Sequence, residues 1–218
     1  MPAAGRAARV AVVGAGMAGL TAARTLAGAG LEVTLLDKSR GPSGRMATRR
    51  TAARAFDHGA QFFTVRDARF GRALQATQAP LAPWRATFVR VLSDDGRQIG
   101  ALPPDGETRW LPVPGMNALP KAWVAHWLAD HPGTRAHWNT PVQALRRALV
   151  DVTGIGAEPA LAVAHRWRYA QTQRALGEPF LWDAAAGLGL CGDWCLGHRV
   201  EHAFLSGLEL ALAVAAAR

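Results

Sequence analysis

The sequence predicts an α/β fold, because three features follow one another near its start. Val10–Val13 is a short β-branched run, Gly14–Gly19 is a Gly-x-Gly-x-x-Gly turn, and the acidic residue Asp37 closes a second apolar run. A strand, glycine turn, helix, strand and acid in this order are typical of a dinucleotide-binding unit. We therefore expect a Rossmann-like FAD/NAD(P)-binding domain, joined to a reduced and mostly β second domain.

The elements of this unit can be read in order. Val10–Val13 contains no polar residue, which predicts a strand covered on both faces in a parallel sheet. Leu20–Ala29 is rich in alanine and leucine and lacks proline, which predicts a helix that stops at Gly30. Leu31–Leu36 then predicts the second strand of the sheet.

Each glycine of the turn has a physical role in dinucleotide binding. Gly14 permits the tight turn, Gly16 lets the backbone approach the pyrophosphate, and Gly19 lets the helix lie close to the strand. The N-terminus of the helix offers N–H groups and partial positive charge to phosphates. Asp37 stands 23 residues after Gly14, close to the spacing of about 20 expected for a carboxylate on ribose hydroxyls. The predicted contacts are Gly14, Ala15, Gly16, Met17, Ala18, Gly19, Asp37 and Lys38.

The spacing alone does not choose between flavin and nicotinamide. Directly after Asp37, the segment 38–50 carries another glycine turn and several arginines. Such a turn places a second cationic contact beside the pyrophosphate, but an ordinary basic surface loop has the same composition. Both interpretations stay open on the residues alone.

Composition excludes several classes of protein. The chain has 218 residues, half of them hydrophobic and 19% charged, which excludes disorder and collagen-like repetition. Cys191 and Cys195 are too close in the sequence to form a disulfide that stabilises a domain, so we expect a protein of the reducing cytoplasm. Two cysteines are also too few to hold a metal ion, so no metal is expected. The net charge of +9 comes from scattered arginines, which argues against a nucleic-acid partner. Ala203–Ala217 is shorter than the roughly 20 residues of a membrane span, so no membrane association is expected.

Several separate motifs resemble one enzyme family in both content and order. They are DKSRGPSGRMATRR from Asp37, FDHGAQFFT at 56–64, PGMNAL at 114–119, HRWRYA at 165–170, CGDWC from Cys191, and RVEHAFLSG ending at Gly207. Together they resemble the renalase-like branch of the flavin amine-oxidase superfamily.

This resemblance implies an FAD held along the first strand and helix. It places the second pyrophosphate contact at Arg45 with Gly44 and Met46, and a strand near the isoalloxazine ring at 59–62. It also places Val142 near the adenine, Asp193 at the ribityl or phosphate oxygens, and the N-terminus of a helix starting near Val200 at the flavin pyrimidine edge. The implied contacts are Gly44, Arg45, Met46, Gly59, Ala60, Gln61, Phe62, Val142, Asp193, Val200 and Glu201.

Three departures from the family pattern stand out. Ser43 and His202 occupy positions where such sequences usually carry glycine, and a side chain there could disturb a turn or crowd the ring. Between Arg147 and His165 the chain offers only 148–164, where the family completes a meander and builds a substrate domain. Roughly 100 residues, one domain's worth of chain, are missing by this comparison, which resembles an internal deletion.

The rest of the chain predicts a thin second domain. A hairpin is expected from Trp84–Val91 and Arg97–Ala101, an amphipathic helix at Lys121–Leu128 and a buried strand at Gly187–Cys191. A closing helix is expected at Ala203–Ala217. The FAD-binding domain is assigned to 1–80, 112–150 and 185–218, and the substrate-domain remnant to 81–111 and 158–184.

The predicted function is an FAD-dependent oxidoreductase acting on a small-molecule substrate. Hydride would pass from a reduced donor, a dihydronicotinamide or an amine, to flavin, with NAD(P)H as one candidate electron donor. No catalytic acid or base can be named from spacing. Two alternatives stay open: a catalytically impaired FAD-binding remnant, and an NAD(P)-dependent dehydrogenase. The short-chain type of dehydrogenase is disfavoured, because Tyr169 is followed four residues later by Gln173 instead of lysine.

Overall fold

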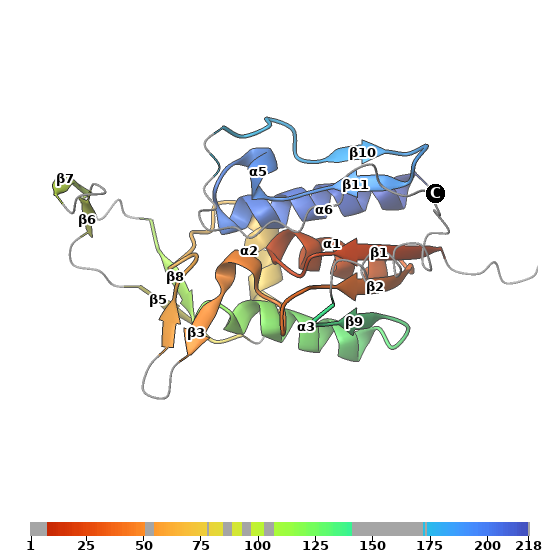
Figure 1. Ribbon diagram of the computed structural model, residues 1–218, viewed down its shortest axis with the longest axis horizontal. Coiled ribbons are helices and arrows are strands. Elements are labelled where there is room, and N and C mark those ends of the chain that lie inside the picture. Colours follow the sequence, from red (N-terminus) through yellow and green to blue (C-terminus); the bar gives the residue numbers. More distant parts are fainter. Residues whose placement is uncertain are drawn as a thin grey trace, which may run out of the picture.

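The computed structural model places a small parallel sheet at the centre of the molecule (Figure 1). It describes residues 8–50, 55–77, 79–84, 89–92, 97–102, 107–140, 172 and 174–217. The sheet has the order β1 (Arg9–Val13), β2 (Glu32–Leu36), β9 (Arg135–His137), and both pairings are parallel. In register, Val10 faces Val33 and Leu35 faces Ala136. The fold is therefore α/β and Rossmann-like, as the sequence predicts.

Helix α1 (Met17–Gly28) connects β1 to β2 and ends where the sequence predicts. At its end the Gly30 N–H donates to the Ala27 carbonyl and the Leu31 N–H donates to the Leu26 carbonyl. Gly30 has a φ of +83°, which a side chain would strain, so glycine stops the helix there.

Two further helices flank α1, as Figure 1 shows: α6 (Val200–Ala216) on one side and α3 (Ala118–Asp130) on the other. The approach of α6 depends on Gly207, because a Cβ there would lie 2.1 Å from the Ala18 carbonyl oxygen. α3 confirms the predicted helix and buries Trp123 and Trp127. These helices and the sheet share a core that includes Leu20, Ala23, Leu26, Val33, Leu35, Trp127 and Ala211.

Shorter elements surround this core. Helix α2 (Ala68–Gln75) packs against α6, the 3₁₀ turn η1 covers Gly44–Met46, and α5 covers Asp193–Leu196. Four antiparallel pairs follow: β3 (Thr48–Arg50) with β4 (Ala55–Asp57), β5 (Leu81–Pro83) with β8 (Trp110–Pro112), β6 (Val89–Leu92) with β7 (Gln98–Leu102), and β10 (Leu181–Asp183) with β11 (Leu188–Leu190). Within the described part of the chain, no helix is both long and apolar enough to cross a membrane.

Four expectations about strands need correction. The predicted strand at 59–62 is absent, because Ala60 donates its N–H to the Arg45 carbonyl and thereby leaves the β4 ladder. Trp84 lies outside the hairpin, since it follows β5 and donates to the Arg109 carbonyl. The strand predicted at Gly187–Cys191 exists as β11, paired with β10, but it is not buried, since Leu188 is 55% exposed. β1 is likewise only partly covered, with Val13 at 56% exposure.

Candidate functional site

The glycine turn after β1 has the geometry that the sequence predicts. Gly14 has a φ of +104°, and its N–H donates to the Leu36 carbonyl at 2.8 Å, so the turn is fixed to the end of β2. A Cβ on Gly19 would lie 1.9 Å from the Gly14 carbonyl oxygen, so only glycine lets α1 pack this closely. Gly16 caps α1, no side chain bonds the cap and no acidic residue lies in the first turn. The N-terminus of α1 is therefore suited to an anion.

Asp37 lies directly beside this turn. One oxygen of its carboxylate accepts from the Ala15 N–H at 2.6 Å, and the other accepts from the Ser39 N–H at 2.7 Å. The backbone of Asp37 is held by His137, whose carbonyl accepts the Asp37 N–H at 2.9 Å. The neighbouring Lys38 is exposed. The structure thus brings the acid and the turn together at the carboxyl edge of the sheet, where ligands of such sheets bind.

The second glycine turn packs against the first. The Ser43 N–H donates to the Ala15 carbonyl at 3.1 Å, and a Cβ on Gly44 would lie 2.9 Å from the Gly16 Cα. Gly44 has a φ of +53°, whereas Ser43 has a φ of 174°, which is extended backbone open to any residue. The serine at position 43 therefore leaves this turn intact.

The segment after β4 also packs against the second turn. A Cβ on Gly59 would lie 2.0 Å from the Arg45 carbonyl oxygen, and the same oxygen accepts the Ala60 N–H at 2.8 Å. Gln61 is exposed and Phe62 is half-buried, with its ring centroid 5.1 Å from that of Trp84. Met46 is buried in a second core that includes Met17, Ala18, Phe63 and Ala203.

Arg45 and Asp193 form an ion pair, although 148 positions separate them in the sequence. The Asp193 carboxylate is 8% exposed, whereas the Arg45 side chain is 44% exposed. Ser206 positions the turn before Asp193, because its hydroxyl accepts the Gly192 N–H at 2.9 Å. The sequence prediction missed Ser206, although a hydroxyl between apolar residues of this helix was a signal for it.

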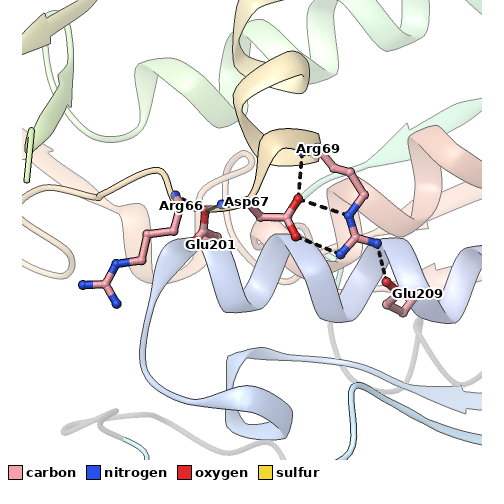
Figure 2. A network of polar contacts seen from close by, with 5 residues as sticks. All are labelled: Arg66, Asp67, Arg69, Glu201 and Glu209. Carbon is pink, nitrogen blue, oxygen red and sulfur yellow. Dashed lines mark hydrogen bonds and ion pairs between the residues drawn. The ribbon is translucent and has the colours of Figure 1, made fainter.

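The Glu201 side chain contacts the start of α2, as Figure 2 shows. Its carboxylate accepts the N–H groups of Arg66 and Asp67, each at 2.7 Å, and Glu201 is only 3% exposed. Asp67 in turn caps α2 by accepting the Arg69 N–H at 2.7 Å. The Glu201 side chain therefore anchors α2 to α6, so of Glu201 only the backbone is left for the predicted cofactor contact.

His202 packs against the linker between α5 and α6. Its Nδ1 is buried without a hydrogen-bond partner among the described residues, and a Cβ on Gly197 would lie 2.6 Å from it. Burial, and secondarily Arg199, lower the pKa of His202. The imidazole therefore faces Gly197, and its neutral form is favoured.

The two cysteine thiols, the motifs outside the described residues and the 114–119 motif complete the set of predicted site features. Burial raises the pKa of Cys191 to about 11 and also raises that of Cys195, so neither thiol is suited to act as a nucleophile. The predicted adenine contact Val142 and the motif at 165–170 lie outside the described residues. The 114–119 motif is fixed to the β3–β4 hairpin by Asp57, whose carboxylate accepts from Thr48 and from the Met116 N–H.

The match to a family of known proteins lies in the first third of the chain. Residues 12–76 match the NAD(P)-binding Rossmann-like domain. Hydroxyneurosporene desaturase of Rubrivivax gelatinosus is 50% identical over 58 residues, which are 27% of this chain and 11% of that protein. An L-amino-acid oxidase of Pseudechis australis is 64% identical over 42 residues, which are 19% of this chain and 8% of the oxidase. The matched segments thus span about a tenth of these relatives.

Two solved structures show limited similarity. A redesigned putrescine oxidase is 26% identical with a TM-score of 0.35, covering 44% of this chain and 22% of the other. A p-nitrophenol 4-monooxygenase of Pseudomonas putida is 21% identical with a TM-score of 0.36, covering 61% of this chain and 32% of the other.

Proposed function

We propose that this chain binds FAD and serves as an oxidoreductase of the renalase-like, amine-oxidase-like type, shortened by an internal deletion. The observation that carries the proposal is the contact between the two glycine turns. It places Arg45 near the N-terminus of α1, with Asp37 at the same edge of the sheet. The similarity of short segments to a desaturase and an L-amino-acid oxidase supports a flavin over a nicotinamide cofactor.

The residues present fit a dinucleotide. The first turn of α1 has no side-chain cap, the two turns meet at glycines where a side chain would collide, and Arg45 is partly exposed. The N-terminus of α1 and Arg45 would hold the diphosphate, and Asp37 the ribose. When bound, FAD would supply the hydride acceptor, in this proposal for a dihydronicotinamide or amine donor, with reoxidation by oxygen or another acceptor.

The chain's own contribution to the reaction is binding and orientation. The N-terminus of α6, whose first turn carries Val200 and Glu201, presents a partial positive charge that would favour negative charge beside it. Because Glu201 fixes this turn to α2, the backbone N–H groups have a defined direction. Asp193 is held by Arg45 and by the turn that Ser206 positions, so its carboxylate is oriented toward the same region.

A flavin spectrum of the refolded chain tests the proposal. We expect a yellow protein whose visible absorbance is bleached by a reduced nicotinamide or amine donor under anaerobic conditions. A yellow but inert protein indicates a binding remnant. A colourless protein that binds nicotinamide nucleotide indicates a dehydrogenase and overturns the assignment of FAD.

Matched arginine variants test the site. Arg45→Ala should lower flavin occupancy far more than Arg24→Ala, because only Arg45 lies beside the glycine turns. Loss of one charge-assisted phosphate contact corresponds to about tenfold or more in affinity. Equal occupancy in both variants would remove Arg45 from the site.

A further inference from the structure

The outer edge of β1 is unpaired within the described part of the chain. The sheet has the order β1, β2, β9, so β1 has a neighbouring strand on one side only. Toward that side the Ala8 carbonyl accepts the Glu32 N–H at 3.0 Å, and the Gly14 N–H donates to the Leu36 carbonyl at 2.8 Å. The direction of the backbone groups alternates along a strand, so positions 8, 10, 12 and 14 face β2.

The residues in between direct their N–H and C=O groups to the opposite edge. They are Arg9, Ala11 and Val13. Arg9 and Val13 are exposed and Ala11 is half-buried, so this edge is open on the surface that the structure describes. A row of unpaired backbone groups along an apolar strand is a template for another strand, which would satisfy each of these groups. The edge of β1 is therefore suited to strand addition.

Strand β11 lies beyond this edge, on the side of β1 that faces away from β2, as Figure 1 shows. The carboxyl ends of β1 and β11 lie at the same edge of the fold, because Asp193 after β11 pairs with Arg45 beside the glycine turn after β1. Among the described strands β11 pairs with β10 and not with β1. Leu188 and Leu190 of β11 are 55% and 49% exposed. The two strands thus run in the same direction without contacting each other through a ladder.

Helix α6 connects the two strands. A Cβ on Gly189 of β11 would lie 2.8 Å from the Leu210 side chain of α6. Val10 and Val12 of β1 pack against the core that includes Ala211, the next residue of α6. Neighbouring residues of α6 therefore reach β11 and the core beneath β1, which puts both strands in one layer over this helix. We call the place between them the β1–β11 slot.

The segment 141–171, which lies outside the described residues, begins and ends beside this slot. Before it, the Thr140 N–H donates to the Asp37 carbonyl at 3.1 Å, at the carboxyl edge of the sheet. After it, the Leu176 N–H donates to the Trp194 carbonyl at 3.0 Å, just beyond the carboxyl end of β11. A strand of five residues, the length of β1, spans about 17 Å. The segment is long enough to run along β1 and to return.

We propose that Ala148–Val152 of this segment is the strand that fills the β1–β11 slot. Its sequence is apolar except for Asp151 and includes two β-branched residues, which suits a partly buried strand. The other apolar run of the segment, 160–164, is rich in alanine and has a lower preference for strands. Side chains alternate along a strand, so Asp151 takes the exposed face, that of Val13, when Val150 faces α6.

This strand joins in one sheet the two strands that carry predicted cofactor contacts. Gly14 follows β1, and Asp193 follows β11. The distance between these contacts then depends on a continuous ladder as well as on the ion pair of Asp193 with Arg45. The inference does not depend on which cofactor binds. It means that the shortened region 148–164 keeps a strand of the sheet.

Amide hydrogen exchange followed by NMR in the full chain tests the inference. We expect the Ala11 and Val13 amides to exchange on the order of 100-fold more slowly in the original chain than in Val150→Pro, because proline breaks the added strand. The amides at positions 10 and 12, which bond to β2, should stay protected in both chains. Ala157→Pro makes the same substitution outside 148–152, so it is the matched control and should exchange as the original chain does.

A nitroxide attached to Asp151→Cys gives a second measurement without a strand-breaking residue. The label reacts with the new thiol, because burial raises the pKa of Cys191 to about 11 and also raises that of Cys195. The Ala11 amide signal should broaden more than that of Ala136 in β9, which lies three strand spacings, about 14 Å, from the slot. A diamagnetic label on the same cysteine is the control.

Four results would overturn the inference. Rapid exchange of Ala11 and Val13 in the original chain would show that the edge is open. Unchanged protection of both amides in Val150→Pro would assign the slot to another segment. Protection that rises with protein concentration, together with a dimer in sedimentation, would assign it to a second copy of the chain. If the amides bonded to β2 also lose protection in Val150→Pro, that variant unfolds and the nitroxide decides: equal broadening of Ala11 and Ala136 would refute the placement.

Discussion

Two glycines of helix α1 allow the same chemical change to be tested with opposite expected results. An ideal Cβ on Gly28 has no atom within 4 Å, whereas one on Gly19 would lie 1.9 Å from the Gly14 carbonyl oxygen and 3.1 Å from its carbon. Real Cβ atoms essentially never come within 3.0 Å of such an atom, so the turn must move by about 1 Å or more in Gly19→Ala.

The magnitudes separate the two variants clearly. Replacing a helical glycine by alanine contributes up to about 1 kcal/mol of stability, and less at the end of a helix such as Gly28. In Gly19→Ala the same gain is opposed by overpacking of about 1–3 kcal/mol or more, against backbone that cannot rotate away. We expect Gly28→Ala to be neutral or slightly stabilising and Gly19→Ala to be destabilised by about 2 kcal/mol.

Thermal unfolding followed by circular dichroism measures the difference. For a chain of this size, 2 kcal/mol corresponds to a fall in Tm of about 4–8 °C. Dialysis against ADP adds a second readout, because the displaced turn should no longer bind nucleotide. If Gly19→Ala matches Gly28→Ala in both Tm and ADP affinity, the close approach of helix and turn is wrong.

Three further perturbations have defined outcomes. Asp193→Asn releases Arg45 from its ion pair, so Arg45 can contact the phosphates of ADP, and ADP should bind about threefold more tightly in calorimetry. ADP is the suitable probe because it lacks the ribityl chain that Asp193 is predicted to contact. Unchanged or weaker ADP binding would show that Asp193 does not compete for Arg45. Glu201→Ala leaves two backbone N–H groups without an acceptor and should lower the free energy of unfolding by about 2–4 kcal/mol in urea titrations. Glu201→Gln keeps an acceptor oxygen and should lower it by less than half as much. Equal losses in the two variants would contradict the anchoring role. The pKa of His202 is lower in the folded chain than its ordinary value, so the unfolded chain binds more protons as the pH falls. The contribution of His202 to stability should therefore be present above about pH 6.5 and decrease as the pH drops below that value. Comparison of the original chain with His202→Gln from about pH 7.5 to about pH 5.5 isolates this contribution, and parallel stability curves would refute it.

The sequence was informative where the interacting residues are neighbours in the chain. Gly14, Gly19 and Gly30 act on residues within one helix length, so spacing alone located the turn, α1 and its end. Asp37 was placed by the fixed geometry of a strand, helix and strand.

Long-range contacts could not be derived in this way. The pairing of Arg45 with Asp193 connects distant segments, and only the family resemblance placed both residues at one site. Nothing in the residues around Glu201 indicated that its carboxylate would bind backbone at 66–67, because that contact depends on how α2 lies on α6. The exposure of β11 was missed for the same reason, since apolar composition predicts a strand but not which partner covers it.

The close packing of Gly207 against Ala18 affects when helix α1 becomes protected as the chain is synthesised. The helix that carries the phosphate turn leaves the ribosome early, yet one of its flanks is completed only when residues 200–216 emerge. Until then the small side chains along that flank, Ala18 and Ala22 among them, remain in water. Nascent chains halted before Val200 should therefore be cut readily by proteases within α1, and release of the last helix should abolish that sensitivity.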